Sequence, residues 1–114
     1  MLPKQYRLKK RIAFKATYKV KNSSHLGGVT LFAGILKKED TPTKVGFVVS
    51  KKVHKRAVKR NRLKRLMRES YRLLIKEGAV PDKYISLIFV ASSRLLNMNF
   101  QEVDTAIRKL VYKL

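Results

Sequence analysis

Residues 51–77 read KKVHKRAVKRNRLKRLMRESYRLLIKE, and this stretch decides the fold more than any other part of the chain. Within it, apolar and small residues recur at the 3.6-residue period of an α-helix. The residues on this period are Leu63, Leu66, Met67, Ser70 and Leu74. The pattern predicts a helix over residues 56–77 with one buried face. Gly78 is suited to end that helix, and Pro81 follows shortly after.

The same stretch is strongly basic. Ten of the 18 residues from 51 to 68 are Lys or Arg, and none is acidic. Helical spacing places Arg65, Arg68 and Arg72 on one surface stripe, with Lys64 beside Arg68. Arginine offers a planar fork of donors that matches phosphate oxygens, and like charges three or four residues apart mildly destabilise a helix. A solvated basic face is the alternative, but the pattern favours contact with nucleic acid.

Three apolar segments outside this helix predict strands. Residues 29–36 and 45–51 are rich in β-branched and aromatic residues, and turn residues between them make a hairpin the simplest connection. Residues 84–91 form a nearly continuous apolar run, which is typical of a strand buried on both faces. The pattern leaves open a further short strand before residue 29.

Two more helices are predicted near the ends of the chain. In residues 9–21, the spacing of Ala13, Ala16 or Thr17, and Val20 indicates the buried side of a short helix. The last helix begins near Asn99, where Glu102 completes a capping box, and its buried side comprises Val103, Ile107, Leu110, Val111 and Leu114. The resulting order αββαβα predicts an α+β fold, an α/β sandwich built on one small sheet.

Length and composition exclude several classes of protein. The 114 residues have room for one domain, and 45% hydrophobic residues is too many for a disordered basic tail. The net charge of +21 leads us to expect an acidic partner. No segment approaches the ~18 apolar residues of a membrane span, and a signal peptide is not expected. Without Cys, thiolate metal sites and disulfides are excluded, which fits a cytoplasmic protein.

Aromatic residues beside cations suggest a second contact with nucleic acid. Phe14 and Tyr18 are four residues apart, on one helix face, and Lys15 and Lys19 adjoin them in sequence. Stacking on such rings is worth ~1–3 kcal/mol per base of a single strand. Burial in the core is the competing explanation, and pattern alone does not decide between them. Phe32 would join the pair if its side chain emerged on the same side of the sheet.

Residue spacing does not predict a catalytic site. The two histidines, His25 and His54, are far apart in sequence and have no metal-ligand partner at a useful spacing. His54 lies within the basic run, where contact with phosphate is a simpler role than general-base catalysis. A glycine-rich phosphate loop and a nucleophile elbow are also missing from the sequence.

The stretch SKKVHKRAVKRNRLKRLMRESYRLL resembles the signature of the protein subunit of bacterial ribonuclease P. That family has a Ser/Ala-Lys-Lys strand end, a variable loop and an Arg-Asn-Arg helix, matched here by residues 50–52 and 60–62. The opening Arg7-Leu8-Lys9-Lys10, followed by Phe14 and Tyr18, is similar to the family's opening. The resemblance covers most of residues 5–78. It departs at Tyr18, where many relatives have Phe, and in the loop at 53–57, which lacks a Gly that many relatives have.

The resemblance implies a division of labour between protein and RNA. In this family the RNA subunit holds the magnesium-dependent active site that removes the 5′ leader from precursor tRNA, so no catalytic residue and no metal ligand is expected in this chain. The residues implied to face the catalytic RNA are Lys52, Arg60, Asn61, Arg62, Lys64, Arg65 and Arg68. Those implied to line a cleft for the leader are Phe14, Tyr18, Phe32, Ser50 and Lys51.

The resemblance also refines the expected fold and partners. It implies a ribosomal-protein-like domain over residues 1–114, with a mixed sheet of about four strands. It further implies a left-handed strand–helix–strand crossover, although such crossovers are right-handed in ~98% of cases. The expected partners are ribonuclease P RNA and the precursor tRNA leader, with no membrane and no required protein partner.

Three alternatives belong to other functional classes. The nearest is a structural ribosomal protein bound to ribosomal RNA, which composition alone does not separate from a processing subunit. A DNA-binding helix–turn–helix protein fits less well, because no helix precedes the basic helix at a short turn. A membrane-surface helix fits least, because the apolar stripe of the basic helix is needed for the core.

Overall fold

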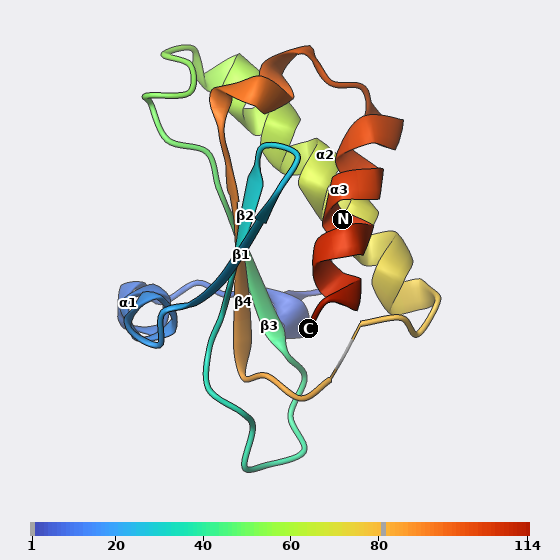
Figure 1. Ribbon diagram of the computed structural model, residues 1–114. Coiled ribbons are helices and arrows are strands. Elements are labelled where there is room, and N and C mark those ends of the chain that lie inside the picture. Colours follow the sequence, from blue (N-terminus) through green and yellow to red (C-terminus); the bar gives the residue numbers. More distant parts are fainter. Residues whose placement is uncertain (1, 81) are drawn as a thin grey trace.

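The computed structural model describes residues 2–80 and 82–114, and it forms an α+β sandwich. A four-stranded sheet carries one helix on one face and two helices on the other (Figure 1). The elements are α1 (Arg11–Lys19), β1 (Asn22–Leu26), β2 (Val29–Ala33), β3 (Lys44–Val48), α2 (Ala57–Lys76), β4 (Ser86–Ala91) and α3 (Phe100–Tyr112). Short 3-10 turns, η1 (Lys4–Tyr6) and η2 (Ser93–Asn97), complete the chain.

The strand order is β1-β2-β4-β3, so the hairpin predicted between residues 29–36 and 45–51 is wrong. β4 lies between β2 and β3, antiparallel to the first and parallel to the second. The physical reason is burial: β4 is the most apolar strand, and both of its faces are covered only at the centre of the sheet. The hairpin instead joins β1 to β2 through Gly27 and Gly28, both at positive φ.

β1 is the strand that sequence patterning could not define. Its sequence, NSSHL, is almost entirely polar, because it is an edge strand with most of its side chains in solvent. The other predicted strands and helices are present with ends shifted by a few residues. The mixed sheet of four strands is confirmed.

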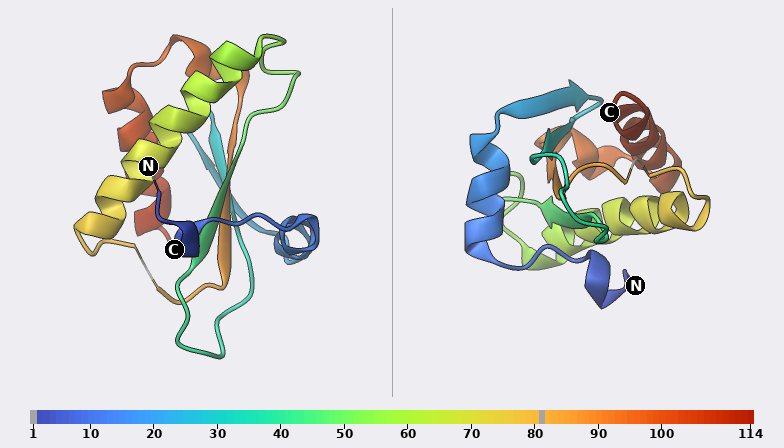
Figure 2. Two further views of the ribbon diagram at one scale, coloured as in Figure 1. Left: turned by 180° about the vertical axis from the view of Figure 1, so that it is seen from behind. Right: turned by 90° about the horizontal axis from the view of Figure 1, so that it is seen from below.

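The parallel strands β3 and β4 are connected through α2 by a left-handed crossover. In Figure 1 both strands run upward and α2 descends on the right of the sheet. The view from below shows β3 at the edge farthest from β1, so the path from β3 through α2 to β4 turns to the left (Figure 2). The unusual hand expected from the family resemblance is therefore present.

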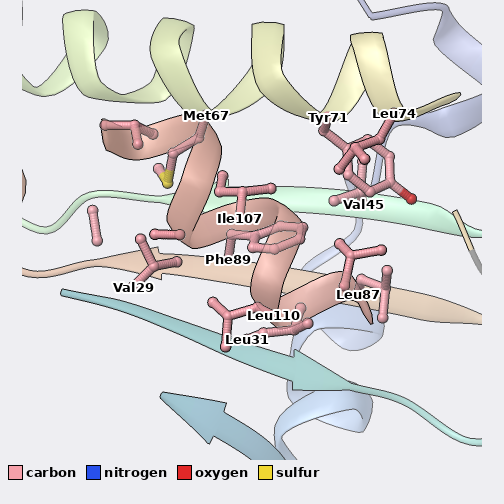
Figure 3. Close-up of a cluster of buried hydrophobic side chains, with 14 of the residues drawn as sticks. Val29, Leu31, Val45, Met67, Tyr71, Leu74, Leu87, Phe89, Ile107 and Leu110 are labelled. Carbon is pink, nitrogen blue, oxygen red and sulfur yellow. The ribbon is translucent and has the colours of Figure 1, made fainter. Parts of the chain in front are cut away.

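The main core lies between the sheet and the pair α2 and α3 (Figure 3). From α2, Leu63, Met67 and Leu74 are fully buried, and Ser70 is buried among them, which confirms the predicted stripe. Leu66 is half-buried, and Tyr71 is a core residue that the periodicity analysis left out. The capping box predicted at the start of the last helix is also present, with both Asn99–Glu102 hydrogen bonds formed.

The N-terminal segment, residues 2–10, closes the free edge of β3. Its Leu8 amide donates to the Val45 carbonyl at 2.9 Å, and Arg7 forms a parallel bridge with the same strand. Leu2 is buried beside α2, on the core side of the sheet, whereas α1 lies on the opposite side. The segment therefore covers the backbone groups of an edge strand and carries the chain from one face of the sheet to the other.

Candidate nucleic-acid interface

α1 packs on the sheet face opposite the main core, and three of its side chains make the contact. The Phe14 ring fills the space where a side chain at Gly46 of β3 would start. Thr17 is buried, and its hydroxyl lies 2.5 Å from that of Ser86 in β4. The Tyr18 ring meets the Phe32 ring of β2 edge-to-face, with centroids 4.9 Å apart.

These contacts correct the buried side predicted for the first helix. Of the predicted residues, Thr17 is fully buried and Ala13 is half-buried, but Ala16 and Val20 are exposed, because the helix faces the sheet with Thr17 and the aromatic pair. Phe14 and Tyr18 are nonetheless only half-buried, so each ring retains a solvent-facing part. Partial burial raises the pKa of the Tyr18 hydroxyl above its usual value. The Phe32 side chain emerges on the sheet face that α1 covers, so it joins Phe14 and Tyr18 as predicted for that case.

The sheet beside α1 forms a partly open floor. Phe32, Ile88 and Gly46 are aligned across three strands directly beneath the helix. The next row, Thr30, Val90 and Val48, is only half-buried. His25 extends that row on β1, where its Nδ1 is 2.9 Å from the Thr30 hydroxyl oxygen. The half-open row and the two aromatic rings together define what we term the α1 cleft.

A basic flank of α1 adjoins this cleft. Ala13 and Ala16 line a hollow with Ile85 and Ser86, on one side of the helix. Helical spacing then places Arg11, Lys15 and Lys19, four residues apart and all exposed, on the opposite flank. The two flanks of α1 thus differ in chemistry, and the cationic one lies toward the half-open row.

The end of β3 brings the remaining predicted cleft residues to the same side of the molecule. Ser50 continues the alternation of Gly46 and Val48, and it is exposed. Lys51 and Lys52 follow in a tight turn, which the Val53 amide closes by donating to the Ser50 carbonyl at 3.0 Å. Both lysines are exposed, between the cleft and the first turn of α2.

α2 presents its basic residues on the side away from the core. Asn61, Arg62 and Arg65 are exposed, and Lys64 and Arg68 are half-buried. The first turn contains no acidic residue and no side-chain cap. An N-terminal helix end without an acid leaves the positive end of the helix dipole available to an anion. Six of the seven residues predicted to face the catalytic RNA, all except Lys52, therefore lie on one helix.

Arg60 also supports the loop before the helix. Its guanidinium donates to the carbonyls of His54 and Lys55, at 2.9 and 2.7 Å. The Arg56 amide donates to His54 Nδ1 at 3.0 Å, which fixes the same loop from the other side. Sequence spacing did not indicate this role. These hydrogen bonds from Arg60 and Arg56 hold the loop before α2 in place, although the loop lacks the glycine that many relatives have.

Ion pairs divide the arginines into two groups. Arg72 donates twice to Glu69, and Arg108 is held by both Glu77 and Asp104. The Arg72 hydrogen bonds lower the pKa of the Glu69 carboxyl. Arg72, included in the basic stripe from its spacing, is thus neutralised locally. Within residues 2–80 and 82–114, the predicted RNA-facing Lys and Arg residues form no ion pair with an acid.

No group of three or more His, Cys, Asp or Glu side chains in the described part of the chain is placed to hold a metal ion. Among the helices of the described chain, none is long and apolar enough to cross a membrane.

A protein-family model described as Ribonuclease P matches residues 2–114. The chain belongs to the ribonuclease P protein family. Among curated relatives, the ribonuclease P protein component of Synechococcus sp. (strain JA-2-3B'a(2-13)) is 36% identical, over 99% of this chain and 84% of the relative. That of Clostridioides difficile (strain 630) is 36% identical, over 91% and 87%. The family resemblance seen in residues 5–78 is thereby confirmed, and the family model extends it to residues 2–114, including the part after Gly78.

Solved ribonuclease P proteins share the fold. The Staphylococcus aureus RNase P protein superposes with a TM-score of 0.81 at 25% identity, covering 96% of this chain and 95% of that one. The Thermotoga maritima protein superposes with a TM-score of 0.77 at 23% identity, covering 95% and 96%. Members of the ribonuclease P family are components of a ribonucleoprotein, so an RNA partner follows from membership. Membership also favours the processing subunit over the ribosomal protein.

Two features of the site were missed by sequence reasoning. Gly46 seats Phe14, and the available signal was a glycine inside an apolar strand, which often marks close approach of another group. The Thr17–Ser86 contact joins residues 69 positions apart, and no local pattern reports it.

Proposed function

We propose that this chain is the protein subunit of a ribonuclease P holoenzyme and that it binds two RNAs. α2 binds the catalytic RNA, and the α1 cleft binds the single-stranded 5′ leader of precursor tRNA. The observation that carries the proposal is the separation of the two surfaces. α2, which carries the basic residues, and α1, which carries Phe14 and Tyr18, lie on opposite faces of one sheet (Figure 1).

The chemistry of the cleft suits a single strand. Half-exposed rings at Phe14 and Tyr18 offer faces for bases, and stacking requires no particular sequence. Arg11, Lys15 and Lys19 supply cations along one side for the phosphates. Lys51 and the hydroxyl of Ser50 extend the cleft toward α2. A duplex offers no unstacked base to such rings, so the proposed ligand is the leader.

The chemistry of α2 suits a folded RNA. Arg62, Arg65 and Lys64 project from one rigid helix, and Lys52 lies just before it. Neutralising phosphates releases condensed counterions, so the affinity should fall steeply with salt. Asn61, an uncharged donor and acceptor between two arginines, adds a group able to contact a base or ribose.

The proposed mechanism places the chemistry in the RNA. Magnesium would be held by the RNA subunit, as the resemblance to the ribonuclease P family implies. The protein would raise substrate affinity and reduce repulsion between two polyanions, which lowers the magnesium concentration needed for cleavage. No further protein partner is part of the proposal. The proposed substrate places the activity in the cytoplasm.

The test is cleavage of 5′-labelled precursor tRNA at low magnesium by bacterial ribonuclease P RNA, with and without this protein. A second basic protein of equal charge is the control. We expect cleavage at the mature 5′ end only with this protein. Equal stimulation by the control protein would show nonspecific charge neutralisation and would contradict the proposal.

A variant test separates the cleft from α2. Phe14→Ala together with Tyr18→Ala should weaken binding of long-leader precursor tRNA relative to leaderless tRNA, by roughly thirtyfold if each ring contributes ~1 kcal/mol, the lower limit for one stacked base. Ile12→Ala is the matched control, because Ile12 is on the same helix and 81% exposed. An unchanged ratio between the two tRNAs would show that the leader binds elsewhere.

A further inference from the structure

Three hollows follow one another along the N-terminal segment and share lining residues. The first, beside α2, is lined by Leu2, Arg65, Arg68, Glu69 and Arg72. The second shares Leu2 and Arg68 with the first, and it shares Arg7, Leu8 and Lys9 with the third. The third reaches Lys10, Ala13 and Lys44 beside α1. The three hollows therefore neighbour one another around the edge of β3.

The middle hollow is basic and partly aromatic. Its cations are Arg7 and Lys9 from the N-terminal segment and Lys64 and Arg68 from α2, and the Phe14 ring supplies an apolar wall. We term these five residues the edge groove. No acidic side chain of the described chain lines it. Its volume of about 280 Å³ is close to the lower limit of ~300 Å³ for small-molecule pockets, so it has room for a short piece of a ligand.

The groove is built rather than incidental. Arg7 is held in place because its Nε donates to the Leu2 carbonyl at 2.7 Å, while the backbone at Arg7 and Leu8 pairs with Val45. Its terminal guanidinium nitrogens have no hydrogen bond to a described residue. Four cations around one hollow repel one another, and an anion bound among them reduces this repulsion.

We propose that the edge groove binds the sugar–phosphate backbone of one RNA strand as it passes around β3, between α2 and α1. Arg7 and Lys9 are the new phosphate ligands, facing Lys64 and Arg68 across the hollow. The inference rests on the proposed function, because RNA is its ligand. The strand belongs either to the leader or to the catalytic RNA, and the two share the same phosphodiester chemistry.

The first experiment measures how holoenzyme assembly and precursor binding depend on salt. It compares two double variants: the groove pair, Arg7→Gln with Lys9→Gln, and a control pair, Lys76→Gln with Lys113→Gln. The control pair removes the same charge from exposed positions outside the three hollows. A plot of log association constant against log salt concentration has a negative slope. We expect the groove pair to reduce the magnitude of this slope by about two, one for each phosphate contact, and the control pair to leave it nearly unchanged. Lys9→Gln alone, which keeps the Arg7–Leu2 hydrogen bond, should reduce it by about one.

The second experiment identifies the strand. The chain has no Cys, so Lys9→Cys carries a unique thiol for an aryl-azide photo-crosslinker, with Lys76→Cys as the control. Crosslinks from position 9 to the leader or to the catalytic RNA assign the source. The inference is overturned if position 9 crosslinks no more than position 76 and the groove pair matches the control pair. If the unvaried protein still supports cleavage in that case, the proposed function stands and only the groove fails.

Discussion

The hydroxyl groups of Thr17 and Ser86 lie 2.5 Å apart between α1 and the central strand β4. Both residues are buried, and the Thr17 hydroxyl also donates to the Ala13 carbonyl at 2.8 Å. This polar contact lies between the two half-buried rings of Phe14 and Tyr18. The buried pair of hydroxyls therefore helps to fix the position of the helix that carries both rings.

Thr17→Val should destabilise the protein by about 1–3 kcal/mol, because it leaves the buried Ser86 hydroxyl without its partner. The substitution preserves side-chain shape, so packing changes little. Urea denaturation of Thr17→Val, of Ser86→Ala and of the double variant measures the effect. The double variant should recover part of the loss. A double variant whose loss equals the sum of the single losses would show that the hydroxyls do not interact.

Gly46→Ala should displace Phe14, because the added methyl carbon would lie 2.6 Å from the ring. Overpacking of this kind costs about 1–3 kcal/mol, and the displaced ring should also weaken leader binding. Adding Phe14→Ala should restore stability but not leader affinity. If Gly46→Ala retains both the midpoint of urea unfolding and the leader affinity, Phe14 is not seated as described.

Polyvalent anions should stabilise the free protein. At a net charge of +21, repulsion destabilises the folded chain, and an anion that binds the native state raises its melting temperature by mass action. We expect millimolar sulfate or phosphate to raise the melting temperature more than sodium chloride at the same ionic strength. Equal melting temperatures in the two salts would contradict this prediction.

The stability of the protein should fall in acid. Hydrogen bonds from Arg108 lower the pKa of the Glu77 carboxyl, and those from Lys37 and Thr43 lower that of Asp82. A carboxyl group whose pKa is lower in the folded state than in the unfolded state stabilises the protein at pH values above its unfolded-state pKa. This stabilisation is lost as the pH falls through its folded-state pKa. The free energy of unfolding should therefore decrease as the pH falls below about 4–4.5, the range of unperturbed carboxyl pKa values.

Glu77→Gln tests one component of that loss. It removes one titrating partner of Arg108, so the variant should lose less stability than the unvaried protein over the same acid range. The measurement is a series of urea titrations between pH 6 and pH 3. Because Glu77 is largely exposed, the effect should be small. Parallel pH curves for the two proteins would show that this pair does not contribute.

The periodicity of residues 56–77 was sufficient to place α2, its buried stripe and its basic side, because all three depend on local helical geometry. The capping box at Asn99 could be predicted for the same reason, because it involves residues only three positions apart. The neighbours of each strand in the sheet could not be predicted in this way, because β4 lies between the two strands that the short connection suggested as a hairpin. Burying β4 on both faces stabilises the fold more than pairing across the short loop would, and this burial exists only in the assembled sheet.

What the sequence by itself determined is the class of partner and the family, because charge, the Arg-Asn-Arg motif and its aromatic companions are properties of the chain. What only the tertiary structure decided is which residues meet. The Phe14 ring packs against Gly46, and the hydroxyl of Thr17 contacts that of Ser86. Arg7 and Lys9 line the same hollow as Lys64 and Arg68 at the edge of β3. Each of these contacts joins residues more than 30 positions apart, and such distances are closed by the packing of α1 and the N-terminal segment against the finished sheet.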